Sequence, residues 1–141
     1  MPDITRTQIL DQARSYLGVR FARSGRSRTG IDCVGLLTLV GRDLGLDIED
    51  ILNYNFEPKP DVFLNIIRSQ TEPVPMNAYK AGNIVLLRQS IYPMHCGIIG
   101  RKPEGLTVIN ANMHERKVVE QPIADWRNEI IELRDYKGIV R

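Results

Sequence analysis

The chain has 141 residues and a mass of 16.1 kDa, enough for one domain with a single hydrophobic core. Hydrophobic residues make up 43% and charged residues 26%, which excludes a disordered or fibrous protein. The 19 basic and 17 acidic residues leave a formal net charge of +2, too small to indicate nucleic-acid binding by itself. The two cysteines, Cys33 and Cys96, are too few for a disulfide framework or a four-cysteine zinc site, so we expect no metal or other cofactor.

We expect neither a membrane-spanning helix nor a secretory signal. The longest apolar runs, such as Ile84 to Leu87, are far shorter than the roughly 18 residues that a membrane-spanning helix needs. Residues 1–6 lack the basic start and apolar middle of a secretory signal. We therefore expect a chain that is made in the cytoplasm and does not insert into a membrane.

The first element predicted is a helix over residues 5–18. Thr5 and Gln8 have the spacing of a capping box at its start, and Gly18 is a typical stop at its end. Residues 19–31 carry glycine and serine without apolar periodicity, which predicts an irregular loop.

Two more helices are predicted before the sequence pattern changes. Apolar residues recur at helical spacing over residues 33–44, with Asp32 in the N-cap position. A shorter helix is predicted over residues 61–69, with Asp61 as its cap. It is bounded by Pro58 and Pro60 before it and by Pro73 and Pro75 after it.

The second half of the chain has the pattern of β-strands. Short apolar or alternating runs separated by turn residues cover residues 84–87, 95–99, 106–111, 118–120 and 130–133. Helices followed by strands, without βαβ alternation, indicate an α+β domain with helices packed on one face of an antiparallel sheet.

Cys33 stands where the loop turns into the second helix. Unpaired backbone N–H groups and the helix dipole favour an anion at that position, so a cysteine there is held as a thiolate more easily than an ordinary one. A nucleophile needs a base, and of the two histidines His95 opens a predicted strand, whereas His114 lies in a probable turn. The alternative is that Cys33 is a small buried hydrophobic residue without chemistry.

A third group is needed to orient the histidine. Asn110 lies 15 residues after His95, a separation that fits two neighbouring strands, and Asn112 shares its face and is the second choice. Because adjacent side chains on a strand point to opposite faces, we expect Cys96 to face away from Cys33 when His95 faces it.

Several segments in this order resemble the NlpC-type cell-wall peptidases. Gly30-Ile31-Asp32-Cys33-Val34-Gly35-Leu36-Leu37 is similar to that family's nucleophile motif, and Ala81-Gly82-Asn83-Ile84-Val85-Leu86 to the opening of a strand. His95-Cys96-Gly97-Ile98-Ile99-Gly100 and Val108-Ile109-Asn110-Ala111 are similar to the strands that carry its other two catalytic residues. The resemblance implies a papain-like fold with helices on a five- or six-stranded antiparallel sheet, in a single domain over residues 1–141.

The resemblance also implies a reaction. The catalytic triad would be Cys33, His95 and Asn110, and the substrate the stem peptide of peptidoglycan, cut between D-glutamate and a diamino acid. The loop at residues 25–30 looks especially like the branch carried by bacteriophage tails and gene-transfer particles. This implies tail-tip or hub proteins as partners and delivery by a virion tail.

Four positions are candidates for substrate contact. Val34 replaces the family's usual serine, and Phe21 stands where a tyrosine commonly assists near the oxyanion. Arg26 belongs to a loop with four arginines that could bind stem-peptide carboxylates, or could be a solvated loop. Asp32 is expected to cap the helix, with substrate contact as a lesser option.

The departures from the family leave two other functions open. Loss of the tyrosine hydroxyl and the serine is compatible with a weak or inactive tail-assembly protein that keeps the fold. A cytoplasmic amidase or acyl transferase is the third possibility.

Overall fold

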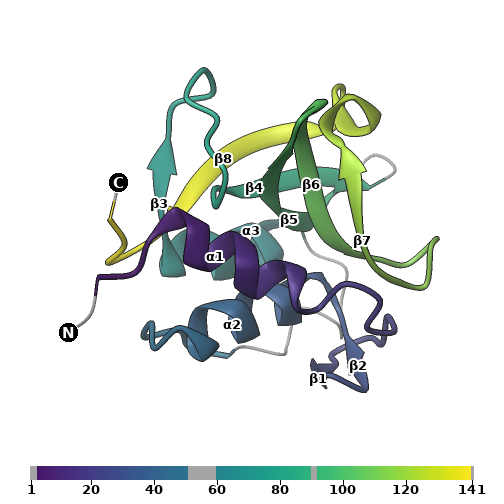
Figure 1. Ribbon diagram of the computed structural model, residues 1–141. Coiled ribbons are helices and arrows are strands. Elements are labelled where there is room, and N and C mark those ends of the chain that lie inside the picture. The colour runs from purple at the N-terminus through teal and green to yellow at the C-terminus, as the bar shows by residue number, and fades with distance from the viewer. Residues whose placement is uncertain (1–2, 51–59, 90–91, 141) are drawn as a thin grey trace.

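The computed structural model describes residues 3–50, 60–89 and 92–140. Helices gather on one side of a curved sheet (Figure 1). The elements in chain order are α1 (Arg6–Arg14), β1 (Arg26–Ser27), β2 (Gly30–Ile31), α2 (Cys33–Asp43), α3 (Pro60–Gln70), β3 (Thr71–Val74), β4 (Ile84–Gln89), β5 (Tyr92–Lys102), β6 (Gly105–Asn112), β7 (Lys117–Pro122), the short 3₁₀ helix η2 (Ile123–Trp126) and β8 (Ile130–Tyr136).

Within the described ranges, the main sheet has six strands in the order β3-β8-β4-β5-β6-β7, with antiparallel pairing throughout. This confirms the predicted α+β class. All five predicted strands are present, and β3 is the strand of this sheet that the sequence did not predict, because Pro73 interrupts its pattern. The segment predicted to be an irregular loop also contains the short antiparallel pair β1 and β2. Proline is tolerated there since β3 lies at the edge of the sheet, where a missing N–H donor costs little.

Both faces of the central strands are buried. In β4, Ile84 and Leu86 belong to the core between the sheet and the helices, while Val85 and Leu87 belong to a second core on the opposite face. This explains why β4 is a continuous apolar run instead of an alternating one. The second core extends to Trp126 at the end of η2.

The three predicted helices are present with shifted ends. Thr5 and Gln8 form the predicted capping box, but α1 ends at Arg14, and Gly18 closes the following turn with a φ of 87°. The third helix begins at Pro60, so Asp61 lies in its first turn and is not its cap. Proline is favoured at a first helical position because its missing N–H needs no partner there. The predicted boundary at Pro58 lies outside the described residues.

Charged side chains tie α1 to the last strand. Arg6 donates two hydrogen bonds to Asp135 of β8, at 3.0 and 2.8 Å, and Asn83 donates a third to Asp135 at 2.7 Å. Beside them, Ile4 and Ile139 form a parallel bridge that joins the segment before α1 to the segment after β8. The described helices include none that is long and apolar enough to cross a membrane.

Candidate active site

Asp32 organises the start of α2. One carboxylate oxygen accepts hydrogen bonds from the Gly35 N–H and from Arg26, and the other accepts one from the Ser24 N–H, all at 2.8 Å. The predicted N-cap is therefore confirmed, and the same carboxylate fixes the preceding loop. Cys33 and Val34 are the first two helical residues, whose N–H groups have no acceptor within the helix and are available to an oxyanion.

Glycines allow the loop to pack this closely against α2. A Cβ atom on Gly35 would lie 2.4 Å from the carbonyl oxygen of Gly25, and one on Gly25 would lie 2.4 Å from the carbonyl oxygen of Gly30. Real Cβ atoms do not approach backbone oxygen so closely, so the glycines of this motif are required by packing.

His95 and Asn110 are brought together as the sequence predicted. The Nε2 atom of His95 lies 2.9 Å from Oδ1 of Asn110, across the ends of β5 and β6. Asn112, the second choice, contacts Asn110 instead: its Nδ2 donates to the same Oδ1 at 3.2 Å. The geometry thus favours Asn110 as the partner of the imidazole.

The thiol of Cys33 meets two side chains of β5. The pKa of Cys33 is lowered to about 6. The largest cause is hydrogen bonding with Cys96; burial raises the pKa, and the hydrogen bond and charge of His95 lower it again. Burial lowers the pKa of His95, but the hydrogen bond and charge of Cys33 outweigh it, so the net shift is upward. These shifts favour a thiolate paired with an imidazolium.

The expectation that Cys96 faces away from Cys33 is wrong. Cys96 belongs to the same core as Cys33, facing the helices, and burial together with its interaction with Cys33 raises its pKa, so it stays a thiol. His95 interacts with Cys33 as well, and the β4–β5 and β4–β8 ladders both shift register next to Leu87, the residue paired with His95. Such bulges increase the local twist and redirect side chains.

Two further residues approach the histidine, and the sequence analysis missed them. The indole ring of Trp126 stacks on the imidazole of His95, with centroids 5.2 Å apart and planes at 27°. Gln121 of β7 accepts a hydrogen bond from the Trp126 indole N–H and another from the Asn110 side chain, both at 3.0 Å. Gln121 lies across from Val108, two residues before Asn110, a diagonal pairing that only the strand register reveals.

The catalytic candidates are nearly enclosed. Cys33 keeps 8% of its surface exposed, compared with 2% for His95 and none for Asn110. Approach to the sulfur is thus narrow, and low exposure strengthens electrostatic interactions within the site.

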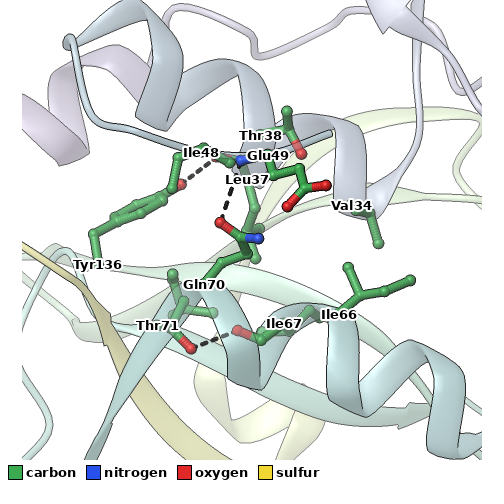
Figure 2. A pocket seen from close by; sticks show the side chains of 11 residues that line it. Val34, Leu37, Thr38, Ile48, Glu49, Ile66, Ile67, Gln70, Thr71 and Tyr136 are labelled. Atoms are coloured by element: carbon green, nitrogen blue, oxygen red, sulfur yellow. Dashed lines mark hydrogen bonds between the residues drawn. The ribbon is translucent and has the colours of Figure 1, made fainter. Parts of the chain in front are cut away.

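Val34 points away from solvent into an apolar pocket between α2 and α3. Its side chain and that of Ile66 point toward each other there, while Tyr136 closes the other end with its hydroxyl bonded to the Leu37 carbonyl at 2.6 Å (Figure 2). An apolar residue in place of serine matches these surroundings. Whether Val34 contacts substrate is untested and stays a prediction.

The other predicted substrate residues lie in or beside the loop. Phe21 is half-buried against the main core and bridges to Ile31. Arg26 is bound within the protein, by ion pairs at 2.8 Å to Asp32 and Asp50, and Arg28 lies 4.0 Å over the Tyr16 ring. The roles of Phe21, Arg26 and Asp32 toward substrate stay predictions.

In residues 3–50, 60–89 and 92–140, no group of three or more His, Cys, Asp or Glu side chains has the arrangement of a metal site.

Comparison with solved structures identifies the fold. The chain superposes over its full length on 43% of a Staphylococcus aureus protein described as similar to lipoprotein, NLP/P60 family, with a TM-score of 0.70 and 19% identity. It covers 41% of a Bacillus cereus NlpC/P60 family protein, with 96% of its own length matched, a TM-score of 0.74 and 16% identity. The third match is the NlpC/p60 domain of the peptidoglycan hydrolase SagA. It aligns over 94% of this chain and 99% of the SagA domain, with a TM-score of 0.69 and 16% identity.

These matches give the chain the α+β fold of the NlpC/P60 proteins, with helices on a six-stranded antiparallel sheet. The chain spans less than half of the S. aureus and B. cereus proteins. No protein-family model and no curated protein matches the sequence.

Proposed function

We propose that this chain is a cysteine peptidase of the NlpC/P60 type that hydrolyses amide bonds in the stem peptides of peptidoglycan. The observation that carries the proposal is a cysteine with a pKa of about 6 at a helix N-terminus, next to a histidine that is hydrogen-bonded to Asn110. Similar folds support it: SagA is named a peptidoglycan hydrolase, and a Bacteroides uniformis protein with a TM-score of 0.64 and 13% identity is named an N-acetylmuramoyl-L-alanine amidase, matched over 94% of this chain and 98% of its own.

We infer the following reaction from this arrangement. The Cys33 thiolate attacks the amide carbonyl carbon, and the N–H groups of Cys33 and Val34 stabilise the oxyanion. The imidazolium of His95 then gives its proton to the leaving amine. Water, deprotonated by the neutral imidazole, attacks the thioester and breaks the bond to sulfur, which releases the acid and restores the thiolate of Cys33 beside the imidazolium of His95.

Two amide bonds are candidates within this substrate class. The resemblance in the sequence favours the bond between D-glutamate and the diamino acid, whereas the name of the B. uniformis protein points to the bond between muramic acid and L-alanine. The experiment below assigns one of them directly.

We further propose that a phage tail or phage-like particle delivers the enzyme, with tail-tip or hub proteins as its partners. The support is the likeness of the loop at residues 25–30 to that branch of the family.

The test is digestion of isolated peptidoglycan followed by mass spectrometry of the fragments. The wild type should release fragments whose masses define the bond, and Cys33→Ala should release none. If folded wild-type protein releases nothing, the proposed activity is wrong for the isolated chain.

The alternative is a tail-assembly protein that has kept the fold without the activity. Phe21 in place of the tyrosine and the 8% exposure of Cys33 favour it. Rapid alkylation of Cys33 at neutral pH would argue for the enzyme, and an unreactive Cys33 for the assembly protein.

A further inference from the structure

The amide group of Asn110 is held by contacts on both of its atoms. Its Nδ2 donates to Gln121 at 3.0 Å and to the Val108 carbonyl at 3.3 Å. Its Oδ1 faces His95 at 2.9 Å and accepts from Asn112 at 3.2 Å. Since an amide rotated by half a turn would exchange its donor and acceptor, this orientation decides what His95 can do.

One chain of hydrogen bonds begins at the indole of Trp126. An indole N–H can only donate, so the Gln121 atom facing it at 3.0 Å must be the oxygen. The same oxygen faces Asn110, and because an amide oxygen can only accept, the Asn110 atom there must be Nδ2. The Oδ1 of Asn110 is thereby turned toward His95.

A second chain begins at the backbone and gives the same result. The Glu115 N–H, again only a donor, bonds to Oδ1 of Asn112 at 3.0 Å. The Nδ2 of Asn112 therefore points at Asn110 and requires an acceptor, which is Oδ1.

We propose that Gln121 and Asn112 are positioning residues that fix the Asn110 amide, so that neutral His95 carries its proton on Nε2 and presents the lone pair of Nδ1 to Cys33. The catalytic meaning of this arrangement rests on the proposed function, whereas the position of the proton on His95 does not. Trp126 acts through Gln121 and also covers the imidazole face.

The proton position can be measured by NMR of ¹⁵N-labelled full-length chain. A Cys33→Ala, His114→Gln parent removes the thiolate that favours the imidazolium and the exposed second histidine, leaving His95 as the one histidine of the chain. Correlation spectra of the ring nitrogens at pH 8 should show the proton on Nε2.

Variants of both positions test the proposal. Gln121→Met removes the acceptor at similar length, and Asn112→Asp keeps the Glu115 contact but turns a second acceptor toward Asn110. Each single variant keeps one of the two series of hydrogen bonds, so the proton should stay on Nε2 of His95. The Gln121→Met, Asn112→Asp double variant loses both series, so the proton should shift mainly to Nδ1. Gln121→Glu, which can only accept, should preserve Nε2–H when combined with Asn112→Asp.

If the Gln121→Met, Asn112→Asp variant fails to fold, Trp126→Phe combined with Asn112→Asp replaces it. This variant keeps an aromatic ring over His95 but removes the N–H that orients Gln121. A proton on Nδ1 in the parent would overturn the proposal. So would an unchanged Nε2–H both in the Gln121→Met, Asn112→Asp variant and in the Trp126→Phe, Asn112→Asp variant.

Activity measurements connect the arrangement to catalysis. In the chain with Cys33 intact, the Gln121→Met, Asn112→Asp variant should lose roughly tenfold or more in kcat, with KM changed less than about twofold. Replacing Met by Glu at position 121 should recover most of the loss. If the wild type cuts no peptidoglycan but the proton moves as expected, the proposed function fails and the positioning role stands. Unchanged kcat despite a moved proton would overturn the catalytic part.

Discussion

The pKa of Cys33 is set mainly by two neighbouring residues of β5. Cys96 lowers it from the core that faces the helices, and His95, which also contacts Asn110 and Trp126, lowers it further. The hydrogen bonds and the charge of His95 favour the thiolate, while burial and the carboxylate of Asp32 favour the thiol. The favourable effects win, and the thiol becomes acidic.

The first prediction concerns the reactivity of Cys33 with pH. Because its pKa is about 6, the thiolate is formed above pH 6, and the rate of alkylation by iodoacetamide should rise through pH 6 and level off above pH 7. An ordinary thiol would instead react faster up to a pKa of roughly 8.5. Peptide mapping should place the label on Cys33, with Cys33→Ser as control. A rate that still climbs steeply between pH 8 and 9 would refute the assignment.

The second prediction isolates the hydrogen bond from Cys96. Cys96→Ala should move the midpoint of the alkylation profile up by about one pH unit, since a hydrogen bond to a charged group is worth about 1.5–3 kcal/mol and one pH unit corresponds to about 1.4 kcal/mol. Cys96→Ser is the matched control, because its hydroxyl can still donate and should keep the midpoint near that of the wild type. Identical midpoints in all three proteins would show that Cys96 is packing alone.

At the scale of elements, the loop before α2 and the helix itself are joined through one buried carboxylate. Asp32 is 4% exposed and binds the Gly35 N–H, the Ser24 N–H and Arg26. Arg26 extends the link to Asp50 beyond the C-terminal end of α2. The position of the nucleophile therefore depends on this carboxylate.

The third prediction is that Asp32→Ala lowers the free energy of unfolding by about 3 kcal/mol, from the lost cap and the unpaired Arg26. Asp32→Asn keeps an oxygen for the Gly35 N–H and should lose roughly half as much. Urea unfolding followed by circular dichroism measures both. Losses below about 1 kcal/mol for the alanine variant would contradict the role of Asp32 as an anchor.

On the scale of the whole molecule, α1 holds the beginning and the end of the chain together. Its Arg6 pairs with Asp135, which is 2% exposed, next to the bridge between Ile4 and Ile139. These contacts lie on different residues from those around Cys33, so stability and chemistry should be separable.

The fourth prediction tests that separation. Arg6→Met should lower the free energy of unfolding by about 3 kcal/mol, because it leaves a buried carboxylate without its cation. The alkylation profile of Cys33 at 20 °C should be unchanged. Arg6→Lys retains the charge and should lose less. A shifted profile in a folded Arg6→Met protein would show that the two regions are coupled.

Local patterns in the sequence predicted the helices and five of the six strands of the main sheet. Capping residues, apolar spacing and turn residues act over a few positions, so they can be detected without the fold. The strand at Thr71–Val74 was missed because whether a proline is tolerated depends on its place at a sheet edge, which is a property of the assembled sheet.

The sequence by itself determined the helix that begins at Cys33, its Asp32 cap and the strands that carry His95 and Asn110, because each has a local signal. Only the tertiary structure decided that Asn110 and not Asn112 faces the imidazole, that Cys96 lowers the pKa of Cys33, and that Gln121 and Trp126 complete the surroundings of His95. The reason is physical: these contacts depend on strand register and on which atom of each amide faces a fixed donor.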